Sequence, residues 1–243
     1  MIRVSLVIPA YNEIALLPRL LDSVDAARAQ YAPGPNAVEV IVADNASTDG
    51  TGALAVQRGC TVVSVSRRSI AAARNGGASV AQGDVLCFVD ADMRIHSDTF
   101  NAITTAVARR DVVAGATGVR LERWSVGIAI TYLLLLPLVI VARMDTGVVF
   151  CRRADYEAVG GYDEQRQIGE DVAFLWALRK LGKRCGQRLV RLRAVKALAS
   201  MRKFDEHGDW HYLTQVIPRG VRACLRPSAP CEFVKQYWYP DER

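Results

Sequence analysis

Short apolar runs alternate with polar turns and helix-like segments through the first 90 residues. The helical spacing is clearest after Glu13, where apolar residues recur every three or four positions and Asn12 is the expected N-cap. Further helices are expected over 51–58 and within 68–81. The apolar runs, each expected to form a buried strand, are residues 4–10, 38–44, 60–66 and 85–90.

The rest of the chain is less regular. Residues 112–118, 146–152 and 188–200 have the composition of strands. Residues 169–182 predict a helix that opens on two acids and closes with two cations and a glycine. Apolar strands that alternate with helices indicate an α/β fold, with a mostly parallel central sheet flanked by helices on both faces. We expect a single Rossmann-like domain with a C-terminal extension.

One long apolar segment stands out. Residues 124–142 contain no charge and are flanked by Arg123 and Arg143, a length that could just span a bilayer. It is the one such segment and it interrupts a continuous domain, which favours a helix pair broken near Pro137 that lies in a membrane interface. Contact with the core or with a second subunit, in a homodimer, and a true span are the alternatives.

The net charge and the cysteines indicate which kinds of binding partner and which cellular compartment to expect. The net charge of +6 favours anionic partners, but no basic run interleaved with aromatic residues predicts nucleic-acid binding. Six scattered cysteines fit a reducing compartment, and Cys87 and Cys151 look like core residues. Without a cleavable leader in MIRVSLVIPAYNE, we expect a cytoplasmic protein, peripheral at the cytoplasmic face of the membrane.

Two carboxylates, Asp90 and Asp92, follow the apolar run that begins at Val85 and are separated by Ala91 alone. Their repulsion on one face of a strand end is relieved when a divalent cation binds between them. A simple turn is the alternative. In parallel sheets ligands bind beyond the carboxyl ends of the strands, so residues 9–13 and 44–45 are expected in the same cleft.

Five blocks of the chain, in order, resemble the family 2 glycosyltransferases. They are VSLVIPAYNE, VIVADNASTDGT, AAARNGGASVAQGDVLCFVDAD, TGVVFCRRADYEAVGGYDE and GEDVAFLWALRKLG, which together reach from the N-terminus to about residue 182. The resemblance implies a GT-A fold over residues 1–200, with a nucleotide-binding half (1–95), an acceptor-binding half (96–200) that includes the apolar segment, and a basic, aromatic extension (201–243).

The resemblance also implies a donor site and a metal. The donor would be a nucleotide-diphosphate sugar, with a UDP sugar as the first expectation and a GDP sugar used by a polyprenyl-phosphate glycosyltransferase as the alternative. Asp92 would be the ligand of Mn²⁺ or Mg²⁺, with Asp90 nearer the ribose. Asn45 departs from the second aspartate found in many members. The donor nucleotide-binding residues implied are Pro9, Ala10, Tyr11, Glu13, Asp44, Asn45, Arg74, Asp90 and Ala91.

The implied chemistry is an inverting transfer to an acceptor hydroxyl of a glycan or a lipid. The resemblance makes Asp171 the general base, with Glu170 beside it, although acids at a helix start can also simply stabilise the helix dipole. The acceptor loop would contain Gly160, Gly161 and Tyr162, where the glycines would allow a tight turn.

The region after residue 200 suggests three further contacts. Arg202 and Lys203 resemble a segment of some bacterial members and would stabilise the departing diphosphate. His207 is a candidate further metal ligand, with a surface or packing role as its alternative. A non-catalytic nucleotide-binding protein of the same fold is the competing class. The presence of Asp92, Glu170 and Asp171, the acids that a catalyst needs, disfavours it.

Overall fold

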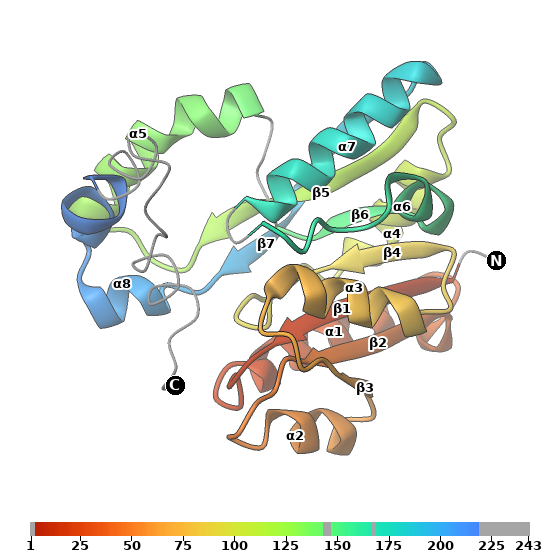
Figure 1. Ribbon diagram of the computed structural model, residues 1–243, viewed down its shortest axis with the longest axis horizontal. Helices are drawn as coiled ribbons and strands as arrows, with labels where there is room; N and C mark the ends of the chain where they lie inside the picture. Colours follow the sequence, from red (N-terminus) through yellow and green to blue (C-terminus); the bar gives the residue numbers. More distant parts are fainter. Residues whose placement is uncertain (1–2, 143–146, 167–168, 219–243) are drawn as a thin grey trace. The chain divides into compact units, whose positions relative to one another are not determined.

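The computed structural model describes residues 3–142, 147–166 and 169–218 (Figure 1). Contacts within the chain divide it into two compact units. The first contains residues 1–120 and 145–199, and the second contains residues 121–144 and 200–243. The boundary at residue 200 expected for a C-terminal extension stays a prediction.

The first unit is built on a seven-stranded sheet with the strand order β3-β2-β1-β4-β6-β5-β7. The first four strands in this order are parallel, and β6 is antiparallel to both β4 and β5. The expected mostly parallel sheet is therefore confirmed, as a mixed sheet. The strands are β1 Val4–Ala10, β2 Val38–Asp44, β3 Thr61–Ser64, β4 Val85–Phe88, β5 Val112–Leu121, β6 Val149–Arg152 and β7 Arg188–Ala199.

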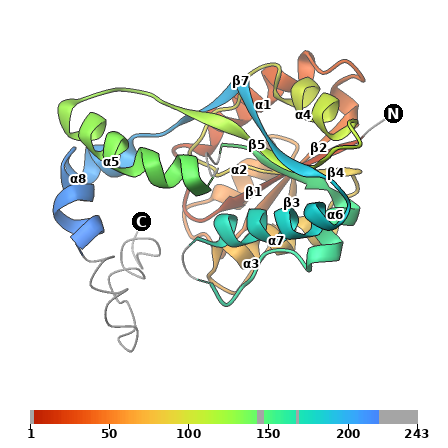
Figure 2. The same ribbon diagram turned by 90° about the horizontal axis from the view of Figure 1, so that it is seen from above.

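Helices cover both faces of this sheet because alternate strand residues point to opposite sides. Leu6 of β1 belongs to a core cluster with α1 and α4, whereas the adjacent Val7 belongs to a second cluster with α3 and α7. Figure 2 shows the same division, with α1 and α4 on one side of the strands and α3, α6 and α7 on the other. The helices of this unit are α1 Leu17–Ala29, α2 Thr51–Gln57, α3 Ile70–Val80, α4 Thr99–Val107, α6 Arg153–Val159 and α7 Glu170–Arg184, with a 3₁₀ turn at Pro35–Ala37.

The start of the first helix differs from expectation. Helix α1 begins at Leu17, and Leu16 is its N-cap, without a side-chain hydrogen bond. Asn12 was wrongly expected to be this cap, because its Oδ1 instead accepts a hydrogen bond from the Thr48 amide, 2.8 Å away. The backbone turns first at Glu13, whose carbonyl accepts from the amides of Leu16, the N-cap, and Leu17, the first helical residue. Helices α4 and α6 were not predicted.

The second unit contains α5 Val126–Ala142, α8 Arg202–His207 and a π-helical turn, Tyr212–Val216. The expected break near Pro137 is wrong: α5 runs through that position, since a proline removes one backbone hydrogen bond and often bends a helix without ending it. Large apolar side chains of α5 face solvent, Val126 at 70% and Leu133 at 67% exposure. Among the described residues, no helix has both the length and the apolarity needed to cross a membrane.

Candidate active site

The carboxyl ends of three parallel strands meet at one edge of the sheet. Ala10 of β1 pairs with Asp44 of β2, and β4 on the other side of β1 leads into Asp90. The loops at this edge contain Asn12 (φ 50°) and Ala46 (φ 63°), the two non-glycine residues with positive φ in the described part of the chain. Such conformations cost of order 1–2 kcal/mol, and they concentrate at functional sites. The sequence had pointed to this edge, but not to Ala46.

The turn after β2 is held by its own side chains. Asp44 Oδ1 accepts from the Ser47 amide at 3.0 Å. Asn45 is 6% exposed, and its Nδ2 donates to the carbonyls of Val65 and Arg67 at 2.8 and 2.7 Å. The side chain of Asn45 therefore fixes the segment after β3, which is a structural task that the sequence did not reveal.

A buried arginine links the edge of the sheet at the strand ends to the start of α7. Arg74 of α3 is 3% exposed. Its Nη2 lies 2.8 Å from Asp90 Oδ1, and its Nη1 lies 2.9 Å from Glu170 Oε1 and 2.7 Å from Asp171 Oδ1. The contact with Asp171 is an ion pair at an angle that makes no hydrogen bond. One guanidinium thus contacts three of the predicted site carboxylates. From the sequence, Arg74 was expected to approach the donor, and its contacts with these acids were not expected.

Burial sets the protonation of this cluster. Burial raises the pKa of Asp171 to about 7, although the Arg74 guanidinium opposes the rise; Asp90 and Glu170 add to it. Burial acts to lower the pKa of Arg74, but the charges of Asp171, Asp90 and Glu170 hold it well above its ordinary value. Asp171 is therefore a carboxylate whose pKa is suited to accepting a proton near neutral pH.

The neighbouring residue on α3 fixes the glycine turn after α6. Asn75 Oδ1 accepts from the Tyr156 hydroxyl at 2.7 Å and from the Tyr162 amide at 2.9 Å. Its Nδ2 donates to the Tyr162 carbonyl at 2.9 Å. Gly160 and Gly161 have φ values of 79° and 74°, as a tight turn of this kind requires. Asn75 is thus a positioning residue that the sequence pattern showed only as part of a motif.

Tyr162 connects the glycine turn held by Asn75 to the cluster of charges around Arg74. Its ring stacks on Phe174 of α7 with the centroids 4.2 Å apart, and the Arg74 guanidinium lies 5.1 Å from its centroid. The Tyr162 hydroxyl is buried beside Asp171, and it makes no hydrogen bond of good geometry within the described residues. The interaction of this hydroxyl with Asp171 acts to lower the pKa of that carboxyl, against the larger effect of burial.

Side chains at the first strand tip suit a planar ring. Arg68 lies over the Tyr11 ring, with Cζ 3.9 Å from the ring centroid. Pro9 and Ala10 are buried in the strand itself, and Glu13 is 7% exposed, with its amide donating to Thr51 Oγ1 at 2.9 Å. This tip can therefore offer an aromatic face and backbone groups to a ligand.

The acids after β4 fit a hard divalent cation. Asp90 and Asp92 are both partly exposed, and they flank Ala91, which is buried. No group of three or more His, Cys, Asp or Glu side chains that could hold a metal occurs in the part of the chain described. Mg²⁺ sites commonly use one or two carboxylates together with substrate phosphates and water, so this donor set is sufficient when a phosphorylated ligand shares the ion.

The predicted residues after position 200 lie in the second unit. Arg202, Lys203 and His207 all belong to α8. The ring of His207 lies against that of His211, with the centroids 5.5 Å apart. Arg202, Lys203 and His207 each make interactions within the structure. The roles predicted for these three residues stay predictions.

Comparison with solved structures defines the class of fold. The mannosyltransferase PcManGT from Pyrobaculum calidifontis, in complex with GDP-Man and Mn²⁺, matches with a TM-score of 0.66 and 21% identity, over 82% of this chain and 57% of that one. TarS of S. aureus matches with a TM-score of 0.62 and 18% identity, over 96% of this chain and 42% of TarS. Glucosyl-3-phosphoglycerate synthase from Mycobacterium tuberculosis, in complex with Mn²⁺, UDP and phosphoglyceric acid, matches with a TM-score of 0.62 and 21% identity, over 86% of this chain and 74% of that one. The fold is that of the GT-A glycosyltransferases, and the chain spans less than two thirds of the first two of these relatives.

The family follows from the sequence itself. The model of Glycosyl transferase family 2 matches residues 5–147, more than half of the chain. The chain belongs to this family, as the five blocks predicted. The comparison with curated proteins found no match.

Proposed function

We propose that this protein is a metal-dependent, inverting glycosyltransferase that moves a sugar from a nucleotide-diphosphate sugar to an acceptor hydroxyl. The observation that supports the proposal most is the buried guanidinium of Arg74, which joins Asp90 on the donor side to Asp171 at the start of α7. Keeping the Arg74 cation buried among three carboxylates, of which Asp90 is partly exposed, is costly for stability alone. A site that must hold donor and base together explains the arrangement.

The donor occupies the strand tips in this proposal. Tyr11 stacks on the nucleobase, Asp44 and Asn45 line the base and ribose pocket, and Asp90 accepts from the ribose. The backbone at Pro9, Ala10 and Ala91 and the side chain of Glu13 complete the wall. A UDP sugar is the first expectation, and a GDP sugar is supported by the likeness to a mannosyltransferase in complex with GDP-Man.

A divalent cation, Mn²⁺ or Mg²⁺, held by Asp92 would neutralise the diphosphate as it leaves. Arg202 and Lys203 are proposed to add positive charge to the leaving group, and His207 to complete the metal shell. The likeness to two structures that contain Mn²⁺ supports the choice of metal.

Asp171 is the proposed base. Its carboxylate takes the proton of the acceptor hydroxyl while the acceptor oxygen bonds to the anomeric carbon and the sugar–phosphate bond on the opposite side breaks. Arg74 fixes the orientation of Asp171, and Glu170 shares the same guanidinium nitrogen. The turn of Gly160 and Gly161, with Tyr162, forms the acceptor side.

The acceptor is proposed to be lipid-linked or a glycan. The exposed apolar side chains of α5, among them Leu133 and Leu134, support a peripheral contact with the cytoplasmic face of a membrane. The same face could instead meet a second copy in a homodimer, and a non-catalytic nucleotide-binding role remains the competing function.

Thermal unfolding with nucleotides tests the donor and metal together. UDP, GDP and thymidine diphosphate are each added with Mn²⁺ or with a chelator; a ligand at 100 times its dissociation constant stabilises the folded state by about 2.7 kcal/mol. We expect one nucleotide to raise the melting temperature only with Mn²⁺, and Asp92→Asn to abolish the shift. Asp84→Asn, which alters an exposed acid just before β4, is the control and should keep it.

Transfer itself is tested by release of nucleoside diphosphate from the donor that binds. A metal-dependent shift without any transfer to lipid or glycan acceptors would favour the non-catalytic function. The absence of a shift with every nucleotide would overturn the proposal.

A further inference from the structure

Positive charge is concentrated in one segment of the first unit. Residues 172–199 contain eight basic residues and no acid, more positive charge than the net +6 of the whole chain. Seven of the eight are exposed, and Arg179 is partly buried. The exposed ones are Lys180, Lys183, Arg184, Arg188, Arg191, Arg193 and Lys196.

Helix α7 presents this charge beside apolar groups. Trp176 is 56% exposed and Val172 is 40% exposed. With Lys180 and Lys183 they follow one another at intervals of four, four and three residues, which places all four on one face of the helix. That face is opposite the buried side of α7, where Phe174 and Leu178 pack on the sheet.

A tight turn brings more cations to the end of α7. The Gln187 amide donates to the Gly182 carbonyl at 2.8 Å, and Gln187 Nε2 donates to the Arg110 carbonyl at 3.1 Å. The Arg188 amide then donates to the carbonyl of Asp111 at 2.9 Å. The turn therefore places the C-terminal cations of α7 next to the loop that follows α4.

Two arginines share one acid at this loop. Asp111 accepts from Arg109 Nε and Nη2, at 3.1 and 2.9 Å, and from Arg188 Nε at 3.0 Å. These two guanidiniums lower the pKa of Asp111 to about 2. Because one carboxylate cannot neutralise two guanidiniums, and each keeps further N–H groups, the pair is prepared to bind an oxyanion.

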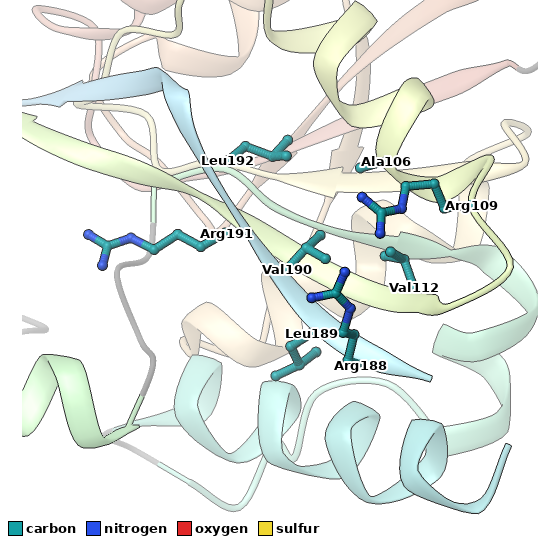
Figure 3. Close-up of a pocket in the computed structure, with 8 residues that line it drawn as sticks. All are labelled: Ala106, Arg109, Val112, Arg188, Leu189, Val190, Arg191 and Leu192. Carbon is teal, nitrogen blue, oxygen red and sulfur yellow. The ribbon is translucent and has the colours of Figure 1, made fainter. Parts of the chain in front are cut away.

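A cavity of about 310 Å³ lies at this pair. Figure 3 shows the guanidinium groups of Arg109 and Arg188 turned toward each other, whereas Arg191 is directed away. Apolar side chains form the rest of the wall. They are Ala106, Val112, Leu189, Val190 and Leu192.

This region is separate from the candidate active site. Glu170 and Asp171 stand at the first turn of α7, and Lys183 and Arg184 stand at its last. A helix of 15 residues is about 22 Å long, so the two groups of charge lie at opposite ends of it. The donor phosphates do not explain the cations at the far end.

We propose that these cations form a docking surface for an anionic phospholipid bilayer. The surface, called the basic face, comprises the exposed cations of 180–196 with Arg109 and Arg110. The arginine pair takes a lipid phosphate, the apolar wall of the cavity accepts the adjoining glycerol and acyl carbons, and Trp176 enters the interface.

Neither protection of a sheet edge nor binding of nucleic acid accounts for the basic face as well. Edge strands often carry a charge that prevents pairing with another sheet, and β7 is the last strand of this one. That reason does not extend to the cations of α7 or to Arg109 and Arg110. Nucleic acid would also attract the charge, but it would leave Val172 and the apolar wall of the cavity without a partner.

Flotation of the whole protein with vesicles tests the proposal. The vesicles contain phosphatidylcholine alone or with phosphatidylglycerol, in the absence of nucleotide. Near a membrane surface each basic residue adds about 1 kcal/mol, so removing two charges should weaken binding about tenfold to thirtyfold. We expect this loss on the anionic vesicles with Lys183→Gln/Arg184→Gln, and a loss for the wild type when salt is raised.

A matched variant removes the same charge elsewhere. Arg19→Gln/Arg28→Gln on α1 should bind like the wild type, and all variants should melt at similar temperatures. Any contact made by α5 would persist on neutral vesicles, which separates it from the basic face. Equal binding to both vesicles, equal loss with the α1 variant, or equally tight binding to a DNA duplex would overturn the proposal.

Discussion

Helix α7 separates two aspartates that both lie beside arginines but have opposite properties. Asp171, at the N-terminal end, contacts Arg74 and has its pKa raised to about 7. Asp111, beside the turn at the other end, contacts Arg109 and Arg188 and has its pKa lowered to about 2. The difference shows that a neighbouring cation does not by itself decide the protonation of an acid.

Burial decides it. Asp171 is taken out of water, and the charges of Asp90 and Glu170 add to the rise of its pKa, so that desolvation outweighs the attraction of one guanidinium. Asp111 keeps its hydration and has two guanidiniums to itself. The buried charges at the N-terminal end of α7 are therefore suited to the proposed proton transfer. The exposed charges at its C-terminal end are suited to the proposed reversible binding of a membrane.

The largest expected effect is the removal of the buried cation. Arg74→Ala leaves three carboxylates without their partner and should lower the free energy of unfolding by about 3–5 kcal/mol. Arg109→Ala, which removes an exposed cation from Asp111, is the control and should change stability little. Urea unfolding of both variants measures the difference; equal effects would contradict the role of burial.

The next effect concerns the proposed base. Asp171→Asn keeps the shape of the side chain but cannot take a proton, and kcat should fall by about 10²–10⁴ with a smaller change in KM. In the wild type, activity should rise with pH through about 7 as Asp171 loses its proton. A pH–rate profile of the wild type without this limb would contradict the assignment.

Asp171 should also make stability depend on pH. Its folded pKa is raised above its unfolded value, so the folded state holds a proton that the unfolded state has lost between about pH 4 and 7. The free energy of unfolding should therefore decrease as pH rises through this range. Asp171→Asn should show less of this decrease, which unfolding at several pH values measures.

A smaller effect tests the packing at the buried end without changing charge. Gly160 and Gly161 both have positive φ, so alanine at either costs about 1–2 kcal/mol. At Gly161 a Cβ would also lie 2.7 Å from the Tyr156 hydroxyl and 2.8 Å from Asn75 Oδ1, whereas at Gly160 it would meet nothing within 4 Å. Gly161→Ala should thus be the less stable variant by about 1–3 kcal/mol in thermal unfolding. Equal melting temperatures would contradict the tight turn.

The smallest effect is expected at the exposed acid. Asp111→Asn removes ion pairs that water screens, so its melting temperature at neutral pH should stay close to that of the wild type. The lowered pKa of Asp111 implies that any stabilisation disappears as pH falls through about 2. A large loss at neutral pH would show that the exposed cluster is structural.

Much of the first half followed from local pattern. The strands at 4–10 and 38–44 are found at the predicted residues because a continuous apolar run between turns can be buried only inside a sheet. The acids after β4 were found by their position at a strand end. Helices without a strong apolar period, such as α6 with no buried residue, were missed.

Residues that act through distant partners could not be recognised this way. Asn75 holds Tyr156 and Tyr162, which are 81 and 87 positions away in the chain. Asn12 looked like a helix cap, yet it bonds to the Thr48 amide instead. A side chain with several possible hydrogen-bond partners takes the one that the fold brings close, and nothing local identifies it.

The sequence by itself determined the order of the strands, the helices α1, α2, α3 and α7, the family, and the positions where acids follow strands, because periodicity and short motifs are local properties of a chain. Only the tertiary structure decided that Arg74 is buried among Asp90, Glu170 and Asp171, and that the cations of 180–196 are exposed. Burial depends on which elements pack together, and it is burial that sets the pKa of each acid and the strength of each ion pair.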